Sequence, residues 1–294
     1  MKKIFLIFII CILMCSCNKN NEARNDMYKI GYSSNLIDEK DRNELRKVFD
    51  EHKLSNVDLF FKWLDDFNKE EDMGCGLKNW DKTDTFIYND ANCMYRYEKI
   101  HSKSDGDCRI TAYALLQNII EINTIESEYG TYLMFDMDVL ENNEDYKTIN
   151  DNQLDFINLF NEMDVSNIEK EEYKNVYPNK LKSHDFKLNS DKVSLISVVL
   201  HDSDFNTLFV GHAGVLINLD DKYLFVEKIA FEQPYQISVI KSKNDLIELF
   251  NSRSTYFGDE SAKGPYIYEN DKLLYEYKWF WLFYKMWYIV FEKQ

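Results

Sequence analysis

The stretch "GHAGVLINLDDKYLFVEK" (Gly211–Lys228) has the pattern of a β-hairpin. Two runs rich in apolar and β-branched residues flank a short polar segment, "NLDD" (Asn218–Asp221), which supplies turn residues. Similar runs before and after it, separated by short polar breaks, extend the pattern to further strands. The predicted strands are Lys192–His201, Leu208–Ile217, Lys222–Phe231 and Tyr235–Ile240. Their close spacing predicts an antiparallel meander.

His212 and Glu227 share one face of this hairpin for every even-membered turn. If all four residues of the "NLDD" segment form the loop, or if its middle two form the turn, His212 lies directly opposite Glu227. If its last two residues form the turn, the register shifts by two and the shared face is kept. A carboxylate in an otherwise apolar strand is costly unless it is paired, so His212 is its expected partner. The alternative is a buried histidine hydrogen-bonded to a backbone carbonyl.

The rest of the chain is predicted to be mainly helical, and most of it precedes the strands. Apolar residues recur at helical intervals in several segments. These are Asp38–His52, Asn56–Glu70, Cys108–Ile122, Asn152–Met163 and, after the strands, Lys243–Ser252. No Pro- or Gly-rich linker divides residues 31–277, so we expect a single domain there. The predicted class is α+β, with a helical N-terminal half packed on an antiparallel sheet.

Cys108 opens one of these predicted helices, after the turn-like "SDGD" that begins at Ser104. Asp107 or Asp105 can cap the helix and leave the thiol in its first turn. A helix N-terminus and a neighbouring imidazolium both stabilise a thiolate. Cys108, His212 and Glu227 therefore form a candidate nucleophilic triad of nucleophile, base and orienting acid. The alternative is that Cys108 is a small core residue.

The same helix start offers one donor for an oxyanion, the backbone N–H of Cys108. The second donor is not identified by the sequence. Tyr97, His101 and Ser102 lie upstream within suitable range.

The first residues, "MKKIFLIFIICILMCSCNKN", have the pattern of an export signal. Two lysines precede an apolar run that is too short to span a bilayer, which takes about 20 residues. The run ends in "MCSC", which resembles a bacterial lipobox with Cys17 as the lipidated residue. We expect a signal peptide over residues 1–16, a flexible tether over 17–30, and a lipid anchor on the outer face of the bacterial membrane. The alternative is an ordinary secretory signal cut nearby.

Four cysteines remain after removal of this signal: Cys17, Cys75, Cys93 and Cys108. If Cys17 carries lipid, an odd number of thiols is left, which is notable in an exported protein. A disulfide between Cys75 and Cys93 would add roughly 3 kcal/mol of stability. That pairing would leave Cys108 free, as a nucleophile requires.

A formal charge of −16 argues against binding to nucleic acid and to anionic lipid head groups. No metal or other cofactor is expected, because the cysteines and histidines lack zinc-binding spacing. The acidic segment Phe135–Asp145 lacks the ligand spacing of a calcium loop and is predicted to be a solvated loop. The segment Ala230–Gln236 is predicted to be a polar connection between strands.

The order Cys108, His212, Glu227, with "DCRITAYALL" and "GHAGVLINLDDKYLFVEK", resembles the papain-like superfamily and its NlpC/P60-type branch. There, a cysteine starts a helix and a histidine-bearing strand follows. The resemblance implies a papain-like cysteine hydrolase that cleaves an amide or peptide bond in a cell-wall peptide or a protein. Arg109, a long segment before His212 and the acidic third member depart from that branch. The competing class is a non-catalytic binding or structural lipoprotein.

Over residues 32–277 the sequence also resembles a family of bacterial surface lipoproteins with a domain of unknown function (DUF4300). "CRIT", "SLISV", "GHAGVLI" and "FVEKIAFEQPYQ" carry this resemblance. It implies a lipoprotein and a shared fold but no activity. Residues 278–294 form a separate aromatic tail, with three of the chain's five tryptophans between Trp279 and Phe291. This tail is an interfacial segment, a buried last element, or an addition to the ancestral domain.

Overall fold

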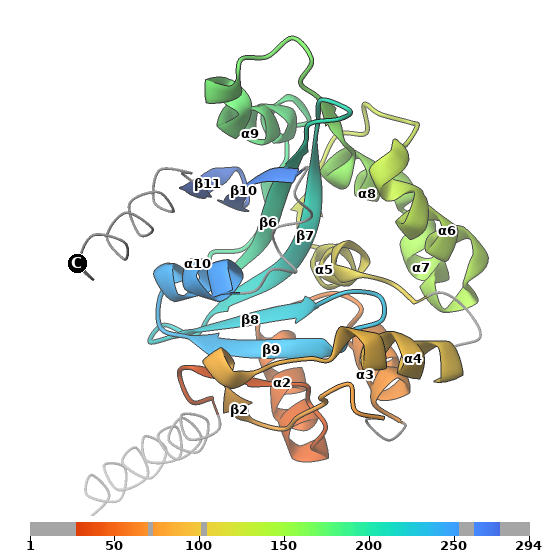
Figure 1. Ribbon diagram of the computed structural model, residues 1–294, viewed down its shortest axis with the longest axis vertical. Helices are drawn as coiled ribbons and strands as arrows, with labels where there is room; N and C mark the ends of the chain where they lie inside the picture. Colours follow the sequence, from red (N-terminus) through yellow and green to blue (C-terminus); the bar gives the residue numbers. More distant parts are fainter. Residues whose placement is uncertain (1–27, 70–72, 101–104, 253–261, 277–294) are drawn as a thin grey trace, which may run out of the picture.

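The computed structural model describes residues 28–69, 73–100, 105–252 and 262–276. The predicted signal peptide, Cys17, nearly all of the predicted tether, and the tail over residues 278–294 lie outside these ranges. A twisted antiparallel sheet runs through the molecule, with helices packed around it (Figure 1). The predicted α+β class is confirmed.

The main sheet has the strand order β11–β10–β6–β7–β8–β9–β1–β2, and β4 pairs with β7. Strands β6 to β9 form the predicted meander, whereas the strands beyond its two ends were not predicted. The strands of this sheet are β1 Tyr32–Ser34, β2 Asp81–Lys82, β4 Met163–Asp164, β6 Val193–Asp202, β7 Thr207–Asn218, β8 Tyr223–Lys228, β9 Tyr235–Ile240, β10 Ala262–Glu269 and β11 Lys272–Glu276. A separate pair joins β3 (Ile120–Glu121) to β5 (Lys187–Leu188).

All five predicted helical segments contain helices, and further helices occur in between. The helices are α2 Glu39–Glu51, α3 Val57–Asn68, α4 Asp90–Ile100, α5 Cys108–Leu116, α6 Met134–Asn142, α7 Lys147–Asn150, α8 Gln153–Phe160, α9 Tyr173–Ser183 and α10 Lys243–Ser252. Short 3-10 turns lie at Thr83–Thr85, Thr131–Leu133, Glu144–Tyr146 and Lys170–Glu172. Helix α5 ends at Leu116, earlier than predicted, because the chain then turns into β3, whose pairing with β5 overrides the helical pattern.

The strands of the meander are apolar on both faces because both faces are covered. Val215 of β7 belongs to the larger core, which it shares with Ile110 of α5. The next residue, Leu216, belongs to a second cluster with Phe225 of β8 and Phe250 of α10. Figure 1 accordingly shows α5 and α10 on opposite sides of β7. The helical half and α10 thus enclose the strands that carry His212 and Glu227.

Cys75 and Cys93 are joined by a disulfide that links the loop before α4 to α4 itself. Replacing both residues by alanine is expected to lower the free energy of unfolding by roughly 3 kcal/mol, because the open chain gains conformational entropy when unfolded. Urea denaturation of the double variant measures this loss. Cys108→Ala is the control that removes a buried thiol but keeps the disulfide. A double variant as stable as the wild type would contradict the prediction.

Candidate functional site

Helix α5 places Cys108 at its first position. The Asp107 carboxylate accepts hydrogen bonds from the backbone N–H groups of Arg109 (2.9 Å) and Ile110 (3.2 Å). Asp107, rather than Asp105, is therefore the N-cap of the helix. This cap uses the second and third N–H groups of the helix and leaves that of Cys108 outside it. The Cys108 thiol is free of any disulfide and 5% exposed.

The hairpin between β7 and β8 turns at the last two residues of "NLDD". Asn218 pairs with Tyr223, and Asp220 has a positive φ of 74°. The direct opposition of His212 and Glu227 predicted for the other two turns is therefore wrong, and the shifted register holds. Continuing this register places Gly214 opposite Glu227, with His212 one diagonal step away on the same face.

Two glycines shape the strand around His212. Between β6 and β7 the register shifts, so that Val198 faces His212 and Val199 faces Val210, which leaves Gly211 as the extra residue of a bulge. A Cβ on Gly211 would lie 2.6 Å from the Leu200 side chain. A Cβ on Gly214 would lie 2.5 Å from the ring of Phe225. Both positions thus require the absence of a side chain, beside the histidine that the bulge orients.

His212 and Glu227 form a buried pair on this face. The distance from His212 Nε2 to Glu227 Oε2 is 2.8 Å, and the two residues are 3% and 1% exposed. Cys108 lies close enough to His212 to raise the pKa of the imidazole. Since Nε2 is bonded to Glu227, Nδ1 is the ring nitrogen left for the thiol. The structure therefore brings the three predicted residues together in the order thiol, imidazole, carboxylate.

The charge state of His212 follows from these neighbours. Burial by itself disfavours the imidazolium, but the negative charge and hydrogen bonds of Cys108 and Glu227 outweigh it and raise the pKa of His212 to about 10. The ring is therefore protonated at neutral pH. An imidazolium next to a thiol favours the thiolate, which is the reactive form of cysteine.

Gln236 holds the other oxygen of Glu227. Its amide Nε2 donates to Glu227 Oε1 over 2.9 Å, and its Oε1 accepts from the hydroxyl of Tyr88 over 2.9 Å. The predicted polar connection holds for residues 230–234, whereas Gln236 lies within β9, the predicted strand Tyr235–Ile240, directly opposite Glu227. A polar residue in the apolar strand "YQISVI", two strand positions from Ser238, was the sequence signal for this role.

Arg109 ties the start of α5 to the rest of the site. Its guanidinium forms two hydrogen bonds to Asp136, at 3.1 and 2.6 Å, and one to the Val210 carbonyl at 2.7 Å. Asp136 is fully buried in α6, so the prediction of a solvated loop over Phe135–Asp145 is wrong. The buried carboxylate needs a cation, and Arg109 supplies it from the residue after Cys108.

Partly exposed aromatic rings lie beside the loop that leads to Cys108. The Tyr97 hydroxyl accepts from the backbone N–H of Asp105 over 2.8 Å. The ring of Phe231 lies 5.3 Å from that of Tyr97 and 5.0 Å from that of Phe135. Three elements thus bring apolar surface next to the start of α5. The two other residues considered as oxyanion donors, His101 and Ser102, lie outside the described residues.

Glu227→Gln is expected to lower the pKa of His212 by about one unit, because the neutral amide removes a charge that stabilises the imidazolium. NMR titration of the His212 ring measures the shift. Glu232→Gln is a matched control in the loop after β8. A His212 pKa unchanged by Glu227→Gln would contradict the pairing.

Among the described residues, no group of His, Cys, Asp and Glu side chains is arranged to hold a metal ion. Within the same residues, no helix combines the length and apolar character needed to cross a membrane.

Comparison with known proteins gives one assignment. No curated protein and no solved structure matches the chain significantly. The sequence profile of one family matches residues 32–274, which include every described strand of the main sheet up to β11 and the three residues of the site. The chain therefore belongs to the family described as "Domain of unknown function (DUF4300)".

Proposed function

We propose that this protein is a papain-like cysteine hydrolase that cleaves an amide or peptide bond. Cys108 is the nucleophile, His212 the acid and base, and Glu227 the orienting group. The observation that carries the proposal is the alignment of a free thiol at a helix start, a buried imidazole and a buried carboxylate at 2.8 Å from that imidazole. Each group has the partner that its chemical role requires.

The reaction would proceed in two transfers. The Cys108 thiolate attacks the carbonyl carbon, a C–S bond forms, and the electron pair moves to the carbonyl oxygen, where the Cys108 N–H donates to it. The C–N bond then breaks, and His212 Nδ1–H gives its proton to the leaving amine. Water attacks the resulting thioester, Nδ1 accepts the water proton, and the thiolate is released with the acid product.

The surroundings support a peptide-like substrate with an apolar part. The rings of Tyr97, Phe135 and Phe231 lie beside the loop before Cys108 and are partly exposed. Aromatic surface of this kind binds apolar side chains by burial and stacking. A cell-wall peptide and an unfolded protein segment both offer such groups.

The proposed location is the outer face of a bacterial membrane. The pattern of residues 1–16 supports export, and Cys17 supports a lipid anchor. A disulfide between Cys75 and Cys93 fits an oxidising compartment outside the cytoplasm. Radiolabelled palmitate incorporated into the wild type but not into Cys17→Ala tests the anchor.

The catalytic proposal is tested first by thiol reactivity. Iodoacetamide at pH 6 should label Cys108 far faster than N-acetylcysteine, because a thiol with an ordinary pKa of about 8.5 is almost entirely protonated there. Release of fragments from cell-wall stem peptides or from denatured casein is then compared with that by Cys108→Ala. Labelling as slow as that of N-acetylcysteine would remove the enzyme proposal.

The second candidate is a non-catalytic binding or structural lipoprotein that keeps this fold. The low exposure of Cys108 and His212, 5% and 3%, favours it, because a nucleophile must be reached by its substrate. Slow labelling combined with a stability loss in Cys108→Ala is the result expected for this candidate.

A further inference from the structure

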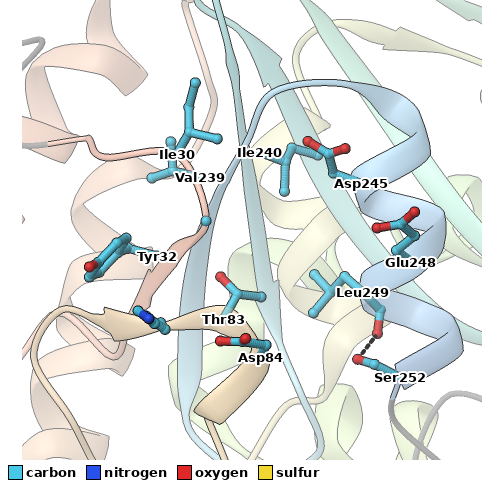
Figure 2. Close-up of a pocket in the computed structure, with 12 residues that line it drawn as sticks. Ile30, Tyr32, Thr83, Asp84, Val239, Ile240, Asp245, Glu248, Leu249 and Ser252 are labelled. Atoms are coloured by element: carbon cyan, nitrogen blue, oxygen red, sulfur yellow. Dashed lines mark hydrogen bonds between the residues drawn. The ribbon is translucent and has the colours of Figure 1, made fainter.

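A cavity of about 540 Å³ lies between α10 and the edge of the sheet formed by β9, β1 and the residues after β2 (Figure 2). Its volume is within the range of small-molecule sites. The residues around it come from segments far apart in the sequence. They are Ile30, Gly31, Tyr32, Lys82, Thr83, Asp84, Val239, Ile240, Asp245, Glu248, Leu249 and Ser252.

The lining combines apolar walls with a negatively charged rim. Figure 2 shows Ile30 and Val239 on one side and Leu249 on the other. Asp84 and Glu248, which also line the cavity, are exposed. Asp245 is already engaged, since its carboxylate accepts from the N–H and hydroxyl of Ser242 and from the N–H of Lys241. Lys82 is the single cationic residue of the lining. This combination suits an organic cation with an apolar body.

A chain of buried hydroxyl groups begins at this cavity. Thr83 lines it, and its hydroxyl is hydrogen-bonded to that of Ser33 over 2.9 Å. Ser33 is bonded in turn to the hydroxyl of Ser238 over 2.8 Å. Ser33 and Ser238 are both fully buried and lie directly opposite each other on β1 and β9. In each of these bonds either oxygen can be the donor, so the direction of donation along the chain is reversible.

The chain continues to the candidate triad. The Gln236 amide donates to Ser238 Oγ over 3.1 Å and to Glu227 Oε1 over 2.9 Å. Glu227 Oε2 binds His212 Nε2 over 2.8 Å. The amide must point its N–H₂ group at Glu227, because a carboxylate only accepts hydrogen bonds. An unbroken hydrogen-bonded path therefore joins the cavity to the imidazole beside Cys108.

Helix α10 provides a second connection. Leu249 and Glu248 line the cavity, whereas the adjacent Phe250 packs its ring 6.2 Å from that of His212. Helix α10 therefore borders both the cavity and His212.

We propose that this cavity binds small primary ammonium ions that carry an apolar chain, and that their binding lowers the reactivity of Cys108. An ammonium that donates to Thr83 Oγ1 directs the Thr83 proton to Ser33 and the Ser33 proton to Ser238. The positive ends of these hydroxyl dipoles then point along the path toward Glu227. They stabilise the Glu227 carboxylate and weaken its hold on the His212 proton, which disfavours the Cys108 thiolate. The effect on reactivity rests on the proposed pairing of Cys108 with His212, whereas the binding does not.

Hexylamine, added to the full-length protein, tests both the binding and its effect on the reactivity of Cys108. Calorimetry should give saturable millimolar binding of hexylamine, with far weaker binding of hexanol and hexanoate. Glu248→Gln should weaken the binding about fivefold through loss of one rim charge. Saturating hexylamine should slow iodoacetamide labelling of Cys108 at pH 6 two- to fivefold. Absence of saturable binding, or equal binding of hexanoate, would overturn the site.

Ser33→Ala separates binding from its transmission, because Ser33 lies on the hydroxyl path but does not line the cavity. This variant should bind hexylamine within twofold of the wild type but label at the same rate with and without it, because the hydroxyl path is cut. Thr85→Val is the matched control, since its hydroxyl bonds to Lys82 O and lies outside the path. Full slowing by hexylamine in Ser33→Ala, or binding without slowing in the wild type, would overturn the coupling. Neither readout requires hydrolysis, so failure of the proposed enzyme activity is seen separately.

Discussion

His212→Ala is expected to slow iodoacetamide labelling of Cys108 by roughly 100-fold at pH 6 and by less than about threefold at pH 9. In the wild type the imidazolium persists across this range, because the pKa of His212 is raised to about 10, and a neighbouring imidazolium favours the thiolate form of a cysteine. Without the ring this cation is lost, and the reference becomes a free thiol with an ordinary pKa of about 8.5. At pH 6 only about one such thiol in 300 is ionised, whereas at pH 9 most are.

The slope of the pH profile is therefore the decisive measurement. The wild-type rate should be nearly flat between pH 6 and pH 9, and the variant rate should rise steeply with pH. The control is His52→Ala, which removes a histidine at the end of α2 whose ring is hydrogen-bonded to the backbone carbonyl of Val48. Equal slowing at both pH values would mean that His212 affects the access of the reagent to Cys108 rather than the ionisation of the thiol. No slowing at either pH would mean that His212 does not act on Cys108.

The placement of His212 and Glu227 on one face of the β7–β8 hairpin was predictable from the sequence, but the pairing register of the two strands was not. Alternation of side chains along β7 and β8 places His212 and Glu227 on one face for any even-membered turn. The position of the turn depends on whether Asp220 adopts a positive φ, and the neighbouring polar residues of "NLDD" offer comparable turn chemistry. The three-dimensional path of the chain around Gly211, where β7 has an extra residue, decides how His212 is finally oriented.

Elements whose stability comes from distant partners were missed. Strands β10 and β11 lie beyond β6 in the sheet, far from it in sequence, and β1 is only three residues long. Such strands form because an open sheet edge is available to pair with, which local periodicity cannot show. The acidic segment within α6 was predicted wrongly for the same reason, since the buried carboxylate of Asp136 is paired with Arg109, which lies 27 residues away in the sequence.

The polar partners of the triad follow the same rule. Gln236 could be placed opposite Glu227 only once β9 was aligned with β8. The cap at Asp107, by contrast, depends on residues two and three positions away and was among the predicted alternatives. Local chemistry was thus accessible from the sequence, and cross-strand chemistry required the fold.

Arg109→Met is expected to lower the free energy of unfolding by about 3–5 kcal/mol at pH 7, the usual cost of leaving one partner of a buried ion pair alone. The guanidinium binds Asp136, Asp107 and the Val210 carbonyl, and methionine can replace its volume but none of its hydrogen bonds. Arg109→Lys should recover little of the loss, because a single ammonium cannot reproduce the two bonds to Asp136. Urea denaturation measures each variant. Arg46→Met is the control, since its salt bridge to Asp58 is exposed and should contribute less than about 1 kcal/mol.

The pH dependence of this loss identifies its cause. Burial raises the pKa of Asp136, and the charge of Arg109 opposes that rise. A carboxyl group with a raised pKa binds its proton more tightly in the folded state than in the unfolded chain, so a fall in pH stabilises the folded state. The deficit of Arg109→Met relative to the wild type should therefore be largest near neutral pH and shrink toward pH 5. Addition of Asp136→Asn should remove most of the deficit at pH 7, because the neutral amide leaves no buried charge without a partner. A deficit independent of pH, or a double variant no more stable than Arg109→Met, would assign the loss of stability to packing. Arg109 would then position helix α5 by its shape and not by its charge.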